Sequence, residues 1–567
     1  MLSSPSSFYT ALDAPSSSCA PSMADSTNGS KHLLQNLHYL QSDQISNEIE
    51  SHVTVYFDVQ MYSHALTMLL DILTSGISHS TVTSKTACLP IPKYLQIAST
   101  LLVHPSSTTR VKNENLVEVA SRSITLLRSV LAEVGPRNAN LEKAFSFESG
   151  SRYTRRSSRD SGSNSEDDDD IKGPVSKNGL WRCAKDFWQI VGWSFNCSVR
   201  YPKRWRYWKV LLEYLLDVLD ADWYERKALD DAAFNAKVDQ NQGPAELSPG
   251  NESVQDSLLV QYLGGSGNNL NGTAVRRIVK AAFADGSVQS LKAYPEIFEN
   301  ETKDIRKTLA QKRKWDESKN VKEISDDYDD EEEEDLASDT SEDSEESSQR
   351  PSKKGIPTYS STIGDPDSIR LRQRVITLLS RLSVFLPLKF MPVGDVYGLF
   401  AEFTAALPIA SFSLLLNISR TSPFPSEILV SLIQRLCRTY LPKSTPNPSD
   451  FEDSTNDLLN QEILETCFLP WCPMTSSVED NAKYSILVEY LFRLFLTGCE
   501  ASHTPNLDDV VERGISAREK KCKTDGRRKA GAIKKEEEVA KIFLDASSRR
   551  LRSLVDWVQE CSSQQGY

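Results

Sequence analysis

The chain has 567 residues, of which 39% are hydrophobic and 25% are charged, and its formal net charge is −13. This length allows two to four domains with a core in part of the chain. The ten cysteines form no CxxC pair, and the Ser- and Pro-rich start lacks the blocks of a signal peptide. These features exclude a disulfide-stapled secreted protein and predict an intracellular compartment. Because six of the seven histidines precede residue 105, no Cys/His group has zinc-ligand spacing, and we expect neither metal nor cofactor.

The first part of the chain is predicted to be a tail followed by helices. Residues 1–30 are rich in Ser, Pro and Thr and poor in bulky apolar side chains, which is typical of disorder. A helical segment is expected over 31–142, most clearly at 49–73 and 116–134. In the second of these helices apolar residues recur at helical spacing, and Gly135 followed by proline ends the pattern.

A linker and a tryptophan-rich module come next. The serine-rich linker over 143–177 is first basic and then acidic, and it is predicted to be disordered. The helical module is predicted over 178–317, where Pro202 suits the first turn of a helix with a wide apolar stripe. Six of the nine tryptophans gather in one short stretch of this module: Trp181, Trp188, Trp193, Trp205, Trp208 and Trp223.

The second predicted linker, over 318–366, is strongly acidic. It holds fourteen acidic residues between Asp326 and Glu346, with no Lys or Arg among them, so the rest of the chain is close to neutral. A C-terminal helical-repeat-like module is predicted over 367–561, with a basic segment near 518–535. Three apolar stripes mark its helices, Leu371 to Leu386, Ile428 to Tyr440 and Leu487 to Phe495, and Pro387, Pro442 and Gly498 follow them.

These patterns predict an all-α protein. Its modules would be irregular helical repeats, similar to an α-solenoid, separated by disordered acidic and serine-rich linkers. No stretch alternates convincingly with period two, which argues against a sheet of any size. The apolar run 396–418 is long enough to span a bilayer, but Glu402 and Pro408 within it favour two buried helices that meet at the proline.

The helix that starts at Pro202 combines basic and aromatic residues, and two interpretations remain open. As a binding surface it would hold a protein partner, or stack unpaired bases on its rings and neutralise phosphates with its cations. As part of the core its tryptophans would face inward, and this is favoured because they continue in register into Leu212 and Leu215. The candidate contact residues are Arg200, Lys203, Arg204, Trp205, Arg206, Trp208 and Lys209.

The acidic tract 326–346 has three possible roles. It would bind histones or other basic proteins by charge complementarity, or it would shield basic patches of its own chain at high effective concentration. The third role is that of a solubilising spacer. The sequence leaves all three open.

Short basic and serine-containing motifs predict a nuclear phosphoprotein. Two basic clusters resemble nuclear localisation signals, and the C-terminal one is the better candidate because a Gly-containing polar segment between helices would expose it. The localisation candidates are Lys312, Arg313 and Lys314, and Lys520, Lys521, Lys523, Arg527, Arg528 and Lys529. The phosphorylation candidates, which lie beside basic or acidic residues, are Ser157, Ser158, Ser165 and Thr340.

The motif search predicts no enzymatic activity, because the sequence has no phosphate-binding loop, nucleophile elbow or HExxH. We expect a non-enzymatic nuclear scaffold or adaptor subunit that binds other proteins in a chromatin, DNA-repair or chromosome-maintenance complex. The alternative is a nucleic-acid-binding or ribosome-assembly factor that uses residues 200–209. No membrane partner is expected.

Overall fold

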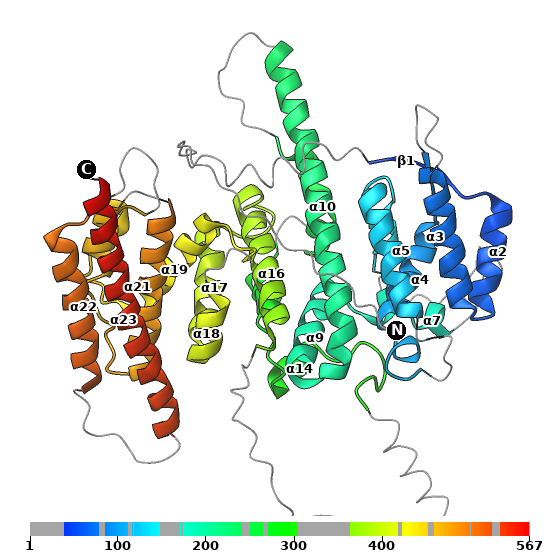
Figure 1. Cartoon of the computed structure of the whole chain (residues 1–567). Helices are drawn as coiled ribbons and strands as arrows, with labels where there is room; N and C mark the ends of the chain where they lie inside the picture. The colour runs from blue at the N-terminus through cyan, green and yellow to red at the C-terminus, as the bar shows by residue number, and fades with distance from the viewer. Residues whose placement is uncertain are drawn as a thin grey trace, which may run out of the picture. The chain divides into compact units, whose positions relative to one another are not determined.

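The computed structural model of the chain (Figure 1) is mostly helical. The predicted tail 1–30 and the acidic tract 326–346 lie outside the residues that it describes. The described residues are 39–78, 86–111, 116, 118–147, 171, 174–240, 250–264, 270–303, 363–417, 422–451, 459–498, 501–523 and 533–565.

The first helices share one apolar core. They are α2 (Asn47–Asp58), α3 (Tyr62–Ser78), α4 (Pro92–Val103), the short η1 (Pro105–Ser107), α5 (Val119–Glu133) and α6 (Leu141–Ala144). Helix α3 contacts α2 and α5, and α5 contacts α4. The prediction of one helix over 49–73 is wrong, because the chain turns between α2 and α3 and Gln60 adopts a φ of 62°. The helix predicted at 116–134 is confirmed as α5, and Gly135 follows it with a φ of 79°.

Two short strands form a parallel pair that the sequence did not predict. Strand β1 (Gln41–Gln44) pairs with β2 (Thr86–Leu89), and Gln41 lies opposite Thr86. All four side chains of β1 are polar and exposed, so no period-two pattern marks it. Strand β2 buries Ala87 and Leu89 and contacts α3. The expectation of no sheet of any size is therefore wrong for this pair, although the described chain is otherwise helical.

The middle of the chain is organised around one long helix. Its elements are α7 (Pro174–Lys177), α8 (Leu180–Cys183), α9 (Phe187–Arg200), α10 (Pro202–Gln240), α11 (Glu252–Gln255), α12 (Leu258–Gln261), α13 (Gly272–Ala282) and α14 (Val288–Ala293). The first residue of α10 is Pro202, as predicted, because the missing N–H of proline costs nothing in the first turn. Helix α10 packs against α9, α4 and α5.

The C-terminal part is also helical. Its elements are α16 (Pro366–Phe385), α17 (Val393–Ala405), α18 (Ile409–Leu415), α19 (Ser426–Tyr440), η5 (Pro448–Asp450), α20 (Gln461–Ile463), η6 (Leu464–Phe468), α21 (Val478–Gly498), α22 (Pro505–Lys523) and α23 (Ile533–Gln565). The three predicted apolar stripes lie on α16, α19 and α21, where Leu379, Ile433 and Leu487 are fully buried.

The apolar run 396–418 is interrupted, as its sequence predicted. Helix α17 ends before Leu407, and α18 begins directly after Pro408. Glu402 lies at the surface and pairs with Arg276 on α13. Within the described ranges, no helix is both long and apolar enough to cross a membrane.

Ion pairs connect α10 to α16. Arg374 on α16 lies 2.8 Å from carboxylate oxygens of both Asp217 and Asp220, and Arg381 lies 2.9 Å from Asp220. Residues from Tyr39 onward cluster as one compact unit. Two modules are predicted on either side of the acidic linker, and their described parts therefore share an interface. The module boundaries stay a prediction.

Candidate protein-binding site

The six clustered tryptophans are core residues. Trp205 is 5% exposed, and the other five are less exposed still. Four of the six donate their indole N–H to acceptors far away in the chain, whereas the buried Nε1 of Trp193 has no partner among the described residues. Trp181 donates to Ser99 Oγ at 2.8 Å, and Trp188 donates to the Tyr262 carbonyl at 2.7 Å. The interpretation of the tryptophans as core is confirmed.

Arg204 is also buried, and it anchors the start of α10. Its Nε donates to Glu301 Oε2 at 2.7 Å, and its Nη1 donates to Thr108 Oγ1 at 2.9 Å. Glu301 accepts three further bonds, one from Trp208 Nε1 at 3.1 Å and two from the backbone N–H groups of Ile297 and Phe298. The guanidinium of Arg204 and the carboxylate of Glu301 thus compensate each other's charge in the protein interior, as a buried ion pair requires.

This burial corrects the set of candidate contact residues. The side chains of Arg204, Trp205 and Trp208 are enclosed, and Trp205 donates to Asp365 at 2.9 Å, so no partner reaches them in this fold. They face inward because the apolar stripe of α10 faces α9 and α4, and the register that places Trp208 inside also places Arg204 there.

The other basic candidates stay at the surface. Arg200, Lys203 and Arg206 are exposed. Lys209 is partly exposed and donates to Asp367 at 2.7 Å, and this bond raises the pKa of the Lys209 ammonium. The start of α10 therefore presents a basic surface without exposed aromatic rings from Trp205 and Trp208.

The localisation and phosphorylation candidates lie largely outside the described residues. Lys520, Lys521 and Lys523 belong to the last turn of α22, so this half of the basic cluster is helical and does not lie in a polar linker as expected. The remaining candidates are not described: Lys312, Arg313, Lys314, Arg527, Arg528, Lys529, Ser157, Ser158, Ser165 and Thr340.

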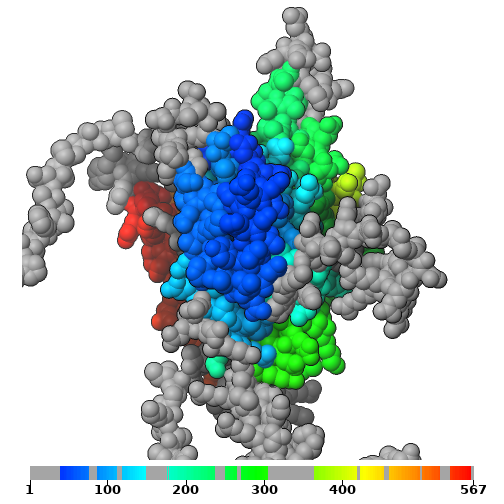
Figure 2. Space-filling model, turned by 90° about the vertical axis from the view of Figure 1, so that its right-hand side faces the viewer, coloured from blue at the N-terminus to red at the C-terminus, as the bar shows by residue number. Residues whose placement is uncertain are grey.

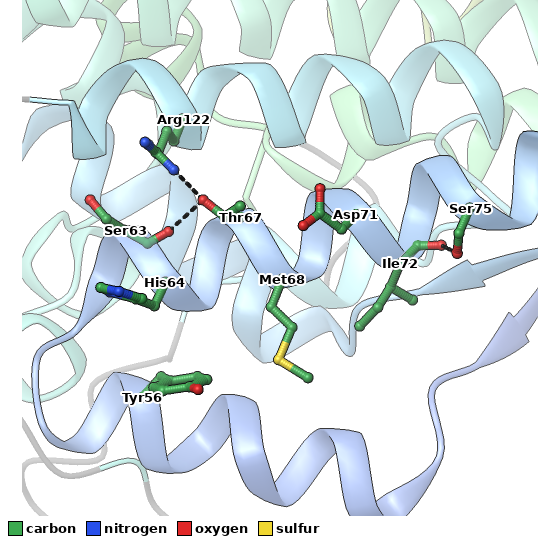
Figure 3. Close-up of a pocket in the computed structure, with 9 residues that line it drawn as sticks. All are labelled: Tyr56, Ser63, His64, Thr67, Met68, Asp71, Ile72, Ser75 and Arg122. Atoms are coloured by element: carbon green, nitrogen blue, oxygen red, sulfur yellow. Dashed lines mark hydrogen bonds between the residues drawn. The ribbon is translucent and has the colours of Figure 1, made fainter.

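A groove along α3 is a surface hollow that sequence reasoning missed. Its volume is about 710 Å³. Helix α3 forms the floor, and α2 and α5 each contribute one lining residue, Tyr56 and Arg122 (Figure 3). Helices α2 and α3 face the viewer in Figure 2. Floor residues His64, Met68 and Ile72 lie four residues apart and so share one face of α3, beside the buried face, and Met68 and Ile72 are partly buried against the core.

Both polar and apolar groups line this α3 groove. The rings of Tyr56 and His64 lie 6.1 Å apart at one end. Arg122 is held by Glu118 at 2.8 Å and also donates to the Thr67 hydroxyl, which fixes the α5 side of the groove. Met68 and Ile72 point from α3 toward α2 (Figure 3). Such a mixture of fixed polar groups and apolar side chains suits recognition of another protein.

Exposed apolar side chains continue from the groove onto α2 and the turn after it. Val55 is 56% exposed, Val59 is 58% exposed and Met61 is 41% exposed. These residues flank Tyr56 in sequence, and the Met61 N–H bonds to the Tyr56 carbonyl at 2.8 Å. The sequence signal was present, because Val55 and Val59 are four residues apart on a helix whose buried residues are Val53 and Phe57.

Neither a metal-binding group among the described residues nor a matching protein family or curated sequence assigns a ligand to the α3 groove. Among the described residues, no group of three His, Cys, Asp or Glu side chains is placed to hold a metal ion. No protein-family model matches the chain, and no curated protein matches its sequence.

Proposed function

We propose that this protein is a non-enzymatic scaffold or adaptor subunit of a nuclear complex that serves chromatin or chromosome maintenance, and that its α3 groove binds an amphipathic helix of another subunit. One observation carries the proposal, namely the open groove of about 710 Å³ beside the exposed Val55, Val59 and Met61. Helices recognised in grooves place apolar residues at i, i+3, i+4 and i+7. The groove floor is itself helical and offers Met68 and Ile72 at the same spacing.

The rest of the molecule would serve as the frame for this groove. We infer that its helices stack as an irregular α-solenoid, in which each helix pair buries its apolar stripe against its neighbours. The contacts of α3 with α5, α17 with α19 and α19 with α21 support this inference. Such an array offers several separate surfaces, which is what a subunit that holds several partners requires.

The proposed nuclear localisation is inferred from the basic clusters. Lys520, Lys521 and Lys523 end α22, and Arg527, Arg528 and Lys529 follow them closely in sequence. A carrier would recognise them as one split cluster. The acidic tract 326–346 would attract histones or other basic proteins to the complex.

A photo-crosslinking amino acid placed at Val59 tests the groove. We expect crosslinks in cells to an amphipathic helical segment of a nuclear protein, and loss of these crosslinks when Ile72→Glu adds a charge to the floor. The control site is Thr74, which is exposed on α3 but does not line the groove. Equal capture at Val59 and Thr74, or capture that Ile72→Glu leaves unchanged, would reject the groove as the binding site.

A second candidate function is nucleic-acid binding, and the exposed Arg200, Lys203 and Arg206 favour it. Because phosphate contacts release counterions, such binding would weaken steeply with salt. The variant with Arg200→Glu and Arg206→Glu would bind less tightly, and neutralising the acidic tract 326–346 would tighten binding. Affinity that is independent of salt in both proteins would dispose of this alternative.

A further inference from the structure

A second hollow lies between the C-terminal helices α18, α21 and α23, at the opposite end of the sequence from the α3 groove. Its volume is about 370 Å³. Leu414 of α18 and Ile542 of α23 line it, and they are 45% and 65% exposed. Large apolar side chains that stay in water on two walls of one hollow are typical of a surface that a partner covers. We call this hollow the C-terminal groove.

An unbalanced group of charges lines the C-terminal groove. Glu489 of α21 is fully buried, and a single oxygen, Oε1, lies 2.7 Å from Arg550 Nε and 3.0 Å from Arg493 Nη2. No other charged residue among those that the structure describes lines the groove, so two guanidinium groups face one carboxylate. The side chains of Arg493 and Arg550 are 36% and 41% exposed, which leaves part of each accessible from solvent.

The second carboxylate oxygen of Glu489 differs from the first. Oε2 is buried and has no hydrogen-bond partner among the described residues. A buried ionised oxygen without a donor costs free energy, and its burial keeps it out of reach of a ligand in the groove. The two nitrogens Nη1 and Nη2 of Arg550 have no acceptor within the described ranges, and they suit a carboxylate that approaches from solvent.

The hydroxyl groups of Tyr490 and Ser413 are already used within the protein. The Tyr490 hydroxyl lies 3.0 Å from Ser413 Oγ and 3.2 Å from the Ser413 carbonyl oxygen, which joins α21 to α18. This bond holds the two walls together beneath Leu414. The groove is thus a built recess that contains two apolar contacts and a net positive charge.

We propose that the C-terminal groove binds a short acidic and apolar peptide segment of a partner protein. A carboxylate of the peptide would pair with Arg550 and Arg493. Apolar side chains next to that carboxylate would cover Leu414 and Ile542. This assignment is independent of the α3 groove, because the two surfaces share no residue.

The test uses the full-length protein and fluorescent peptides measured by anisotropy. One peptide combines Glu with Leu and Phe, a second replaces each Glu by Gln, and a third replaces each Glu by Lys. We expect only the first peptide to bind. Ile542→Asp removes an apolar contact and adds a repelling charge, so it should weaken binding by about ten-fold or more.

The matched control is Gln559→Asp, which adds the same charge at an exposed position of α23 away from the groove. It should bind like the wild type, and so should Val59→Glu, because Val59 does not line the C-terminal groove. The proposal is overturned if the Gln peptide binds as tightly as the Glu peptide, or if Ile542→Asp binds like the wild type. Binding that appears only after the acidic residues of 326–346 are neutralised would also overturn it, because this chain's own acidic tract would then occupy the groove.

Discussion

Arg204 and Glu301 illustrate at the scale of single residues why a basic and aromatic sequence is not by itself a binding surface. The two residues are 97 positions apart in the chain, and both are almost fully buried. The sequence predicted the burial of Trp205 and Trp208 from their register, but it placed Arg204 among surface cations. A local pattern reveals helix register, and it does not reveal which distant carboxylate neutralises an inward-facing guanidinium.

Replacing Glu301 by alanine should destabilise the fold strongly. The substitution leaves the guanidinium of Arg204 buried without its counter-charge, and breaking a buried pair in this way costs about 3–5 kcal/mol. Urea unfolding followed by circular dichroism measures the change. The control is Glu299→Ala, an exposed position two residues away that should change the free energy of unfolding by about 0.5 kcal/mol or less. Equal effects at the two positions would contradict the role of the pair.

His104 should make stability depend on pH. Burial and the nearby charge of Arg204 lower its pKa to about 4, below the ordinary value of 6.5. The folded state therefore holds neutral His104, while the unfolded state gains a proton as the pH falls through 6.5. The contribution of this residue to stability is complete above that pH and is lost progressively down to about pH 4.

Thermal melts of the wild type and His104→Gln between pH 7.5 and pH 5 measure this effect. Carboxylates titrate in both proteins, so the comparison isolates the histidine. Between pH 7.5 and pH 5, the melting temperature of the wild type should fall further than that of the variant. Parallel pH profiles would mean that the imidazole remains free to gain a proton in the folded state.

At the scale of elements, the sequence predicted long helices well and their interruptions poorly. Gly135 ends α5 as expected, and Pro408 separates α17 from α18. The turn between α2 and α3 was missed because Gln60 carries no obvious turn signal, although it adopts a positive φ. The strand β1 was missed because its residues are polar and its pairing with β2 depends on the fold around it.

Gly135→Ala tests the end of α5. A Cβ at this position would lie 2.5 Å from the Tyr39 ring, and the φ of 79° disfavours any L side chain. Strain and overpacking together should lower the free energy of unfolding by about 2 kcal/mol or more.

Gly272→Ala is the matched control, because a Cβ there meets nothing within 4 Å and the residue begins the helix α13. This substitution should stabilise the protein slightly, by about 0.5 kcal/mol. The midpoints of chemical denaturation of the two variants should therefore shift in opposite directions from that of the wild type. A neutral Gly135→Ala would show that the side chain of Tyr39 moves aside easily.

At the scale of the whole molecule, the two proposed binding surfaces consist of residues that no sequence pattern brought together. The α3 groove combines residues of three helices, and the C-terminal groove does the same with three others. Helix propensity and apolar periodicity predicted the frame because they are local properties. The grooves depend on how helices pack. The exposure of single apolar residues such as Val59 and Ile542 follows from that packing and could not be predicted from the local sequence.

The central claim is that the protein holds other proteins, and one measurement tests it most directly. The tagged full-length protein is purified from its own cells with and without nuclease, beside Val59→Glu and the control Thr74→Glu, and the partners are identified by mass spectrometry. The account predicts a set of nuclear proteins that survives nuclease, loses at least one member in Val59→Glu and is unchanged in Thr74→Glu. Partners that vanish with nuclease, whatever the state of the α3 groove, would contradict it and favour direct nucleic-acid binding.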